Sequence, residues 1–262
     1  MTFIASRDNP RARRWRELTR DARERRRQRR AILEGENLIL AFLQSGRTLE
    51  SLMVSKSASN RSGSIALARQ SGETPAVLAD SVFRSIVDIE TPAGIAAEIA
   101  IPRAAQNLKT VGACLFLDAI QDAGNVGTIL RSAMAFGIHR VVLGKGCADA
   151  WSPKVLRAAA GAHFSLQVTE NADLKEKMAE FAGKIVCTAP RGGVAPSAAD
   201  LSGRIGWLLG AEGQGVSEAL ASRASLKISI PMQRGTESLN VAAAAAICFY
   251  EHACRRRAVR YT

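Results

Sequence analysis

The chain has 262 residues, of which 47% are hydrophobic and 23% charged, a balance typical of a globular protein with room for two modest domains. It contains no run of about 18 apolar residues and no apolar stretch in its arginine-rich first segment, so we expect neither a membrane span nor a secretory signal. Five cysteines without paired spacing and three scattered histidines predict reduced thiols, a cytoplasmic location and no metal site.

The formal net charge of +12 is concentrated at the two ends of the sequence. Residues 1–30 contain twelve arginines against four acidic residues, and residues 255–262 add four arginines, so the residues between are formally neutral. The planar guanidinium suits phosphate and base recognition, which makes a nucleic acid the expected partner. A solvated basic helix with no specific partner is the alternative. An anionic membrane surface is a weaker one, because residues 11–30 lack a broad apolar face.

The first hundred residues predict a basic helical arm followed by a short α/β alternation. Asn9 and Pro10 mark the start of the arm helix. Apolar spacing then predicts strands at 32–33, 52–55, 77–78 and 93–102 and helices at 36–44, 64–71 and 80–86. This region has no glycine-rich loop and no acid–base cluster, so we expect it to bind rather than to react.

The polar residues 103–110 predict a linker, with a basic arm and RNA substrate-binding domain at 1–105 and a catalytic domain at 111–262. The second domain predicts an α/β layer with a largely parallel sheet of five or six strands. The expected strands are 114–118, 139–143, 165–168, 184–188, 204–209 and 227–230. The expected helices are 125–136, one begun by Ser152 and Pro153 and closed by Gly161, 173–181, 216–222 and 239–254.

Three segments of the second domain each place an apolar strand before a loop of glycine and polar residues and then a helix. They read DAIQDAGNVGTILRSA (118–133), LGAEGQGVS (209–217) and ISIPMQRGTESLNVAAAAA (228–246). Strand ends and helix N-termini present unpaired backbone groups, and ligands of α/β proteins bind at such junctions. Three of these junctions in one domain predict a composite site, and hence an enzyme.

Each of these segments is ambiguous when it is taken alone. The glycine spacing of GAEGQG does not fit a dinucleotide-binding loop, and Glu212 would repel a pyrophosphate, so a neutral or cationic ligand fits better. The loop could also be only a tight connection. Asn125 and Ser238 could simply cap helices, Asn240 could make only turn contacts, and Arg131 could simply pair with an acid.

Taken together, the segments resemble the three motifs of the SpoU (TrmH-type) branch of the SPOUT superfamily, the RNA ribose 2′-O-methyltransferases. The matching positions are Asn125, Gly127, Arg131 and Ala133 in the first motif, 209–212 and 215–217 in the second, and 230–232 and 238–242 in the third. The intermediate SPKVLRAAAGA (152–162) resembles the family as well. Arginines followed by ILEGENLI (32–39) resemble the substrate-binding domain of rRNA-modifying members, so the resemblance covers essentially the whole chain.

One position departs from the family pattern. Ala123 follows Asp122, where the family usually has proline, and alanine predicts a looser turn ahead of Asn125.

The resemblance implies a C-terminal SPOUT domain with a parallel sheet and a deep trefoil knot, preceded by a smaller ribosomal-protein-like α/β domain. It also implies a homodimer whose active site draws on both subunits, with no metal. The implied cofactor is S-adenosylmethionine, bound largely by backbone groups at Leu209, Gly210, Ile230, Met232 and Leu239. The implied catalytic residues are Arg131, Asn125, Glu212, Ser238 and Asn240.

The implied reaction is methylation of a ribose 2′-hydroxyl, and the large N-terminal domain favours large-subunit rRNA over tRNA as the substrate. Arg131 either removes the hydroxyl proton or orients the target phosphate, since a guanidinium is almost never deprotonated in a protein. The alternatives are a tRNA ribose 2′-O-methyltransferase and a non-catalytic RNA-binding factor of ribosome assembly; a DNA or small-molecule methyltransferase is a weaker one. Cofactor binding distinguishes the enzymes from the non-catalytic factor.

Overall fold

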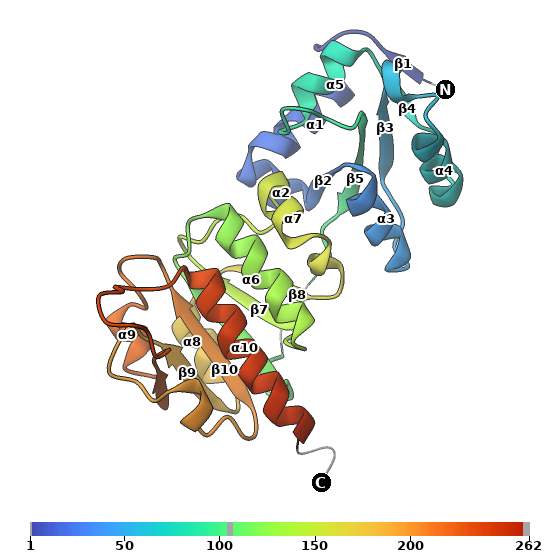
Figure 1. Ribbon diagram of the computed structural model, residues 1–262. Helices are drawn as coiled ribbons and strands as arrows, with labels where there is room; N and C mark the ends of the chain where they lie inside the picture. Colours follow the sequence, from blue (N-terminus) through green and yellow to red (C-terminus); the bar gives the residue numbers. More distant parts are fainter. Residues whose placement is uncertain (1, 104–106, 259–262) are drawn as a thin grey trace. The chain divides into compact units, whose positions relative to one another are not determined.

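The computed structural model describes residues 2–103 and 107–258, with side chains described as far as residue 255 (Figure 1). The chain divides into two compact units. Unit 1 comprises Met1–Pro102 together with Trp151–Phe164, and unit 2 comprises Arg103–Ala150 and Ser165–Thr262. The domain ranges 1–105 and 111–262 stay a prediction. The structure adds that residues 151–164, which lie inside the second range, pack with unit 1.

Unit 1 is built on a mixed sheet of five strands in the order β1-β4-β3-β5-β2. β5 runs antiparallel to β2 and β3, and the other pairs are parallel. The strands are β1 (Thr2–Ile4), β2 (Arg30–Glu34), β3 (Ser51–Ser55), β4 (Ala76–Leu78) and β5 (Ile95–Ala100). The sequence did not predict β1, because three residues are too few to show a period of two.

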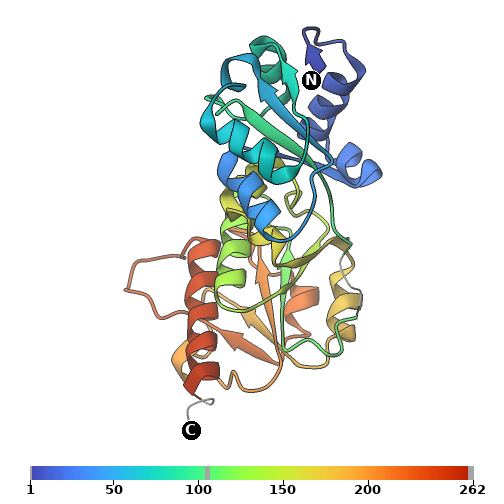
Figure 2. The same ribbon diagram turned by 90° about the vertical axis from the view of Figure 1, so that its right-hand side faces the viewer.

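Helices cover both faces of this sheet (Figures 1 and 2). α1 (Pro10–Arg20) and α5 (Asp80–Ile86) pack on one face, and α3 (Glu36–Gln44) and α4 (Ser62–Ser71) pack on the other. Trp15 and Leu18 anchor α1 in the core, in one cluster with Ile32 and Phe83. α7 (Pro153–Ala159) contacts β2, and the Ser152 hydroxyl caps it, as the sequence predicted.

The basic arm is two helices rather than the single helix expected from the sequence. α1 begins as predicted, with Pro10 in its first turn and the Asn9 side chain accepting a hydrogen bond from Arg11 N. Asp21 has an extended backbone, which ends α1. Its carboxylate then caps α2 (Ala22–Gln28) by accepting from Arg23 N at 2.6 Å. An aspartate inside a run of arginines thus serves as a helix stop and a helix start.

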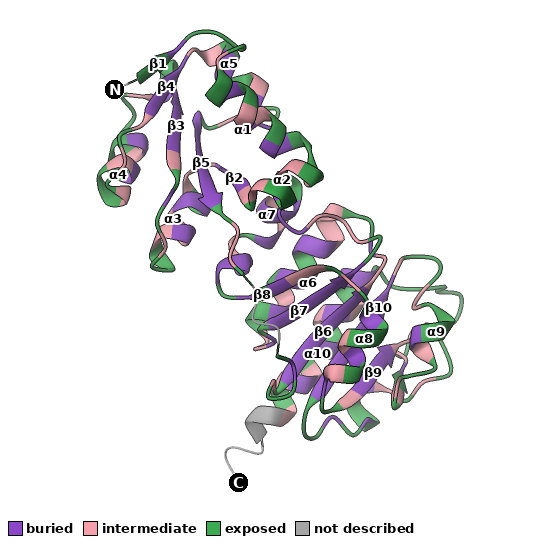
Figure 3. Cartoon of the chain, turned by 180° about the vertical axis from the view of Figure 1, so that it is seen from behind, coloured by how far each residue is buried: buried purple, intermediate pink, exposed green. Residues whose placement is uncertain are grey.

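Unit 2 is built on a six-stranded sheet in the order β11-β9-β10-β6-β7-β8, and every neighbouring pair is parallel. The expected α/β fold class with a parallel sheet is confirmed, whereas the trefoil knot stays a prediction. The strands are β6 (Ala113–Asp118), β7 (Arg140–Gly144), β8 (Gln167–Ala172), β9 (Lys184–Thr188), β10 (Ile205–Gly210) and β11 (Leu226–Ile228). Most of these strands are buried (Figure 3).

α6 (Ala123–Ala135) and α10 (Val241–Ala258) lie side by side on one face of this sheet, and α8 (Leu174–Glu180) and α9 (Glu218–Ala221) lie on the other (Figures 1 and 3). α10 starts two residues later than expected and α9 is shorter than expected, because the glycine-rich and polar loops extend further than apolar spacing suggests. Both differences lengthen the loops at the carboxyl edge of the sheet.

Candidate active site

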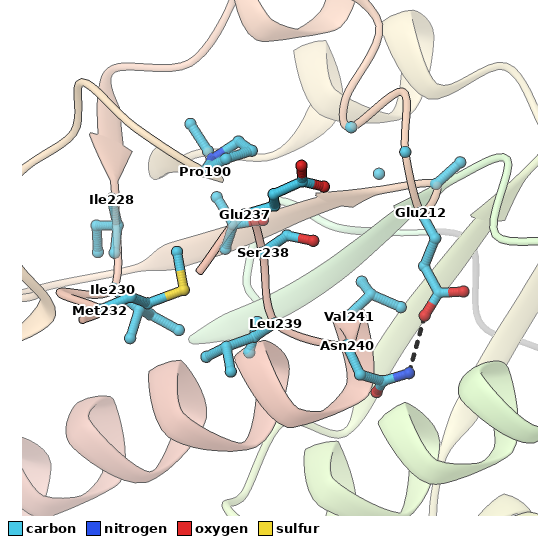
Figure 4. Close-up of a pocket in the computed structure, with 17 residues that line it drawn as sticks. Pro190, Glu212, Ile228, Ile230, Met232, Glu237, Ser238, Leu239, Asn240 and Val241 are labelled. Atoms are coloured by element: carbon cyan, nitrogen blue, oxygen red, sulfur yellow. Dashed lines mark hydrogen bonds between the residues drawn. The ribbon is translucent and has the colours of Figure 1, made fainter. Parts of the chain in front are cut away.

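The carboxyl ends of three neighbouring strands, β9, β10 and β11, open into a cavity of about 400 Å³ within unit 2 (Figure 4). Its walls are mainly apolar, and its polar side chains come from the loops that follow β9 and β10 and precede α10. The apolar lining includes Pro190, Ile228, Ile230, Met232, Leu239 and Val241, and the polar lining is Thr188, Glu212, Glu237, Ser238 and Asn240. This is the edge of a parallel sheet at which ligands bind.

Gly210, the last residue of β10, has no room for a side chain. A Cβ atom placed there would lie 2.1 Å from the carbonyl carbon of Gly215 and 2.2 Å from the backbone nitrogen of Val216. The loop folds back because Gly215 N donates to the Ala211 carbonyl oxygen at 2.8 Å. The backbone itself therefore forms one wall of the cavity, and only glycine permits this close approach.

Asp118, at the end of the neighbouring strand β6, holds the far end of the same loop. It is the register partner of Gly210 in the sheet, and its Oδ2 accepts a hydrogen bond from Ser217 N at 2.9 Å. Both ends of the loop that carries Glu212 are thus fixed to adjacent strands.

Asn125, Glu212 and Asn240, one residue from each sequence motif, form a closed set of hydrogen bonds. Asn240 Nδ2 donates to Glu212 Oε1 at 2.8 Å (Figure 4). The same nitrogen donates to Asn125 Oδ1 at 2.9 Å. Asn125 Nδ2 donates to the same Oε1 at 2.8 Å. The carboxylate is therefore oriented by two amides, which come from the starts of α6 and α10.

The helix caps differ from those that the sequence suggested. Asp122 caps α6, since its Oδ1 accepts from Asn125 N at 2.7 Å. Asn240, not Ser238, caps α10, since its Oδ1 accepts from Ala242 N at 2.9 Å and Ala243 N at 3.2 Å. The Asp122 carboxylate holds the turn in which Ala123 replaces proline. Glu212 consequently lies beside two helix N-termini, where a negative charge is favoured.

The structure brings together most of the residues named from the motifs. Gly210, Ile230, Met232 and Leu239 line the cavity together with Glu212, Ser238 and Asn240, and Asn125 joins them through its hydrogen bonds. Leu209 is fully buried in β10 and is not among the lining residues. Arg131 is exposed on α6 and does not line the cavity either.

Several lining residues were missed by the sequence reasoning, among them those at the carboxyl end of β9 and Glu237. Thr188 is the last residue of β9, Ala189 and Pro190 follow it, and Glu237 precedes the third motif's serine. The rule that parallel strands end at the ligand edge applies to β9 as well, and it could have found the first three. Glu237 lay within the quoted segment, but no hydrogen-bond or capping pattern distinguishes it there.

The lining fits S-adenosylmethionine. It carries two carboxylates, Glu212 and Glu237, and no lysine or arginine, which suits a ligand with a positively charged sulfonium. The apolar walls suit the adenosine portion. Within residues 2–103 and 107–258, no cluster of histidine, cysteine and acidic side chains is arranged to hold a metal ion, and no helix has the length and hydropathy needed to cross a membrane.

Residues 112–250 match the SpoU rRNA Methylase family, and residues 9–97 match the MRM3-like substrate binding domain. The chain is 34% identical over 253 residues to the 23S rRNA (guanosine(2553)-2′-O)-methyltransferase RlmP of Bacillus subtilis, covering 95% of this chain and 98% of that protein.

Solved structures of the same family have the same fold. The SpoU methyltransferase AviRb of Streptomyces viridochromogenes, crystallised with AdoMet, matches with a TM-score of 0.86 at 25% identity, covering 95% of this chain and 98% of that one. A TrmH-family protein of Porphyromonas gingivalis matches with a TM-score of 0.81 at 30% identity, with coverage of 95% and 98%. The resemblance seen in the three motifs is confirmed, and the chain belongs to the SpoU rRNA methylase family.

Proposed function

We propose that this chain transfers the methyl group of S-adenosylmethionine to a ribose 2′-hydroxyl in large-subunit rRNA. The observation that carries the proposal is the Asn125–Glu212–Asn240 hydrogen-bonded set beside a cavity that fits the cofactor. It is supported by the Bacillus subtilis relative, named as a 23S rRNA 2′-O-methyltransferase, and by AviRb, crystallised with AdoMet.

The cofactor, when bound, supplies an electrophilic methyl group. Gly210, Ile230, Met232 and Leu239 would hold it through backbone groups and apolar contacts. The carboxylates of Glu212 and Glu237 complement the positive charge of its sulfonium.

The chain's remaining task is to align the ribose hydroxyl and to promote loss of its proton. Glu212 Oε1 is occupied by the two asparagine amides, while its Oε2 has no hydrogen bond to any residue that the structure describes. This second oxygen accepts a hydrogen bond from the ribose 2′-hydroxyl and takes up its proton when the hydroxyl oxygen is methylated. Ser238, on the same cavity edge, provides a further contact that fixes the sugar's orientation.

Arg131 requires a second copy of the chain in this proposal. Arg131 does not line the cavity of the chain that carries it. It lies one helical turn from Met134, which is 41% exposed. Ile247 and Tyr250 on the adjacent α10 are 42% and 58% exposed. A homodimer that covers this apolar face would carry Arg131 into the partner's site. There the permanently charged guanidinium orients the target phosphate and favours ionisation of the hydroxyl.

The proposal includes a cytoplasmic location. Its support is the rRNA substrate and the free state of the five cysteines, which is typical of a reducing compartment.

The proposal is tested by supplying radiolabelled S-adenosylmethionine to unmodified total rRNA and tRNA and fractionating the RNA afterwards. We expect label in large-subunit rRNA. Arg131→Ala abolishes transfer because the phosphate is no longer oriented, while calorimetry shows cofactor affinity within a few-fold of the parent. Label confined to tRNA, or no label despite cofactor binding, would refute the proposed function, and unchanged turnover in Arg131→Ala would remove that residue from the mechanism.

A further inference from the structure

We propose that unit 1 contacts RNA phosphates through one side of α1, the stripe formed by Arg13, Arg16 and Arg20, and not through the arginine-rich segment as a whole. The inference rests on the proposed function, because it takes RNA as the partner. It assigns different roles to arginines that the sequence presents as a single basic run.

Half of the twelve arginines in residues 1–30 are engaged in contacts within the chain. Arg25 is 4% exposed and ties α2 to the end of α1, since its Nη1 donates to the carbonyl oxygens of Leu18 at 2.6 Å and Thr19 at 2.8 Å. Arg27 binds Glu24 in a bidentate ion pair, which lowers the pKa of that carboxyl to about 2. The engaged arginines of this segment are Arg11 (over the Trp15 ring), Arg14 and Arg30 (with buried Glu98), Arg25, Arg27, and Arg29 (with two backbone carbonyls).

The remaining arginines of residues 1–30 are Arg7, Arg13, Arg16, Arg20, Arg23 and Arg26. Of these, only the three stripe residues lie on α1; Arg13 and Arg20 are exposed there and Arg16 is half-buried. Arg13 and Arg16 make no hydrogen bond or ion pair with any residue that the structure describes, and Arg20 makes only one long contact, to the Ser85 carbonyl oxygen at 3.4 Å. Positions 13, 16 and 20 are spaced i, i+3 and i+7, so they share one side of the helix over about 10 Å. That side is opposite Trp15 and Leu18, which are buried in unit 1.

The surroundings of the stripe favour phosphate as its ligand. Arg84 on the adjacent helix α5 is also exposed and precedes Ser85, the residue that Arg20 contacts. Glu17 is the acidic residue on this side of α1, so positively charged side chains outnumber it. No aromatic or large apolar side chain of α1 is exposed, so the helix offers no platform for stacking bases. The expected contact is therefore with the RNA backbone, strongly dependent on salt and tolerant of sequence.

The same burial argues against a membrane surface. An interfacial helix inserts its apolar side among the lipids, and the apolar side of α1 is already packed in the core of unit 1. Anionic vesicles are accordingly a control in the test.

The test compares Arg13→Gln/Arg16→Gln with Arg27→Gln/Arg61→Gln in the full-length chain. The control pair removes the same charge from two exposed arginines that already have partners, Glu24 for Arg27 and the Ala93 carbonyl for Arg61. Binding of unmodified large-subunit rRNA is measured from 50 to 200 mM salt. Loss of two phosphate contacts lowers the slope of log affinity against log salt by about 1.5, so the parent loses about eightfold more affinity over this range than the stripe variant.

We expect the control pair to keep the parent's slope, and Arg13→Lys/Arg16→Lys to keep most of it because lysine retains the charge. An unchanged slope in the glutamine stripe variant, an equal drop in the control pair, or tighter binding of the parent to phosphatidylserine vesicles than to RNA would each overturn the inference. Methyl transfer by the parent to the same rRNA is assayed in parallel. Its absence would count against the proposed function, whereas transfer combined with an unchanged slope would count against the stripe alone.

Discussion

The position of Glu212 depends on two amides that lie 28 residues after it and 87 residues before it in the sequence. Asn240 donates from one nitrogen to both Glu212 and Asn125, and its oxygen caps α10 at the same time. Each of its polar atoms therefore has a defined role. These hydrogen bonds hold the carboxylate in one orientation before the substrate binds. Little side-chain entropy is then lost on binding, which favours the in-line geometry of the reaction.

Glu212→Gln tests whether the charge of this group matters. Glutamine keeps an oxygen that accepts from both asparagines, so we expect the fold to persist, and cofactor affinity falls only in part because Glu237 remains. With saturating cofactor, methyl transfer should still fall by about 100-fold or more, because the neutral amide cannot take up the proton of the ribose hydroxyl. Single-turnover rates with saturating RNA and cofactor provide the measurement. A rate equal to that of the parent would show that the negative charge has no catalytic role.

The cysteines are expected to differ in how fast they react with a thiol reagent. Burial raises the pKa of Cys114 and Cys248 to about 12 and that of Cys187 to about 11, whereas Cys254 is exposed. At pH 8 we expect a thiol reagent to modify Cys254 rapidly and the buried thiols only after denaturation. Because the folded pKa values exceed the ordinary value of 9.0, the folded state binds more protons above pH 9, and its stability falls as the pH rises from 9 to about 12.

Cys254→Ser is the matched control for that pattern. It should remove the fast phase of modification and leave the slow one. Cys147 is half-buried, so Cys147→Ser is combined with it. A fast phase that survives in the double variant would show that the buried thiols are accessible.

The sequence predicted which residues come together better than it predicted their hydrogen bonds. The resemblance carried by the three motifs named Asn125, Glu212 and Asn240, which the structure joins by hydrogen bonds, and their catalytic roles stay a prediction. The caps that Asn125 and Ser238 could have provided were wrong, whereas those of Asn9 and Ser152 were right. Asparagine, serine and aspartate all cap helices, and the choice among them depends on where each helix begins. The absence of Arg131 from its own cavity could not be predicted, because it depends on which side of α6 faces the sheet.

At the scale of elements, the loop between β10 and α9 is the part of the site most sensitive to distortion. Gly210, at its start, lies in close contact with the backbone of Gly215, and Ser217, at its end, donates a hydrogen bond to Asp118. The backbone of this loop forms a cavity wall, so a shift of the loop changes cofactor binding directly.

Asp118→Ala therefore raises the KM for S-adenosylmethionine by about tenfold, the effect of losing one hydrogen bond to a charged group. The effect on kcat is smaller, since Glu212 keeps its two asparagine partners. Asp118→Asn retains an acceptor oxygen and should recover most of the affinity. Steady-state kinetics of the two variants give the answer. Equal KM values in the parent and Asp118→Ala would show that Asp118 does not position the loop.

Element boundaries were predictable where apolar spacing and stop signals agree. Glu36–Gln44, Asp80–Ile86 and Lys184–Thr188 coincide with the expected ranges. β1 was missed because its stability comes from pairing with β4, a contact 74 residues away that three residues cannot signal. The division of the arm at Asp21 was missed because arginine favours a continuous helix and the capping aspartate was counted only as a charge.

At the scale of the whole molecule, the parallel sheet followed from alternating strands and helices, but its order did not. β10 pairs with β6 and β9, which precede it by roughly 90 and 20 residues, and single-sequence patterns carry no information on such pairing. The packing of residues 151–164 with unit 1 was unpredictable for the same reason. The family resemblance supplied what periodicity could not, including the knot, which stays a prediction.

The proposed homodimer makes a prediction that mixing experiments can check. If each site combines Arg131 of one copy with Glu212 of the other, a mixed dimer of Arg131→Ala and Glu212→Gln has one intact site and one with both defects. Random exchange between the two inactive variants then restores about one quarter of the parent's activity. Mixtures that stay inactive after subunit exchange, shown by exchange of differently tagged copies, would place both residues in one chain's site.

Identifying the methylated nucleoside shows whether the chain methylates a ribose 2′-hydroxyl or a base. Unmodified large-subunit rRNA is treated with the parent chain and labelled S-adenosylmethionine, and the product is hydrolysed in alkali. A 2′-O-methyl group blocks cleavage at its own nucleotide, so our account predicts label in alkali-resistant dinucleotides and none when Glu212→Gln is used. Label recovered in mononucleotides as a methylated base would contradict it.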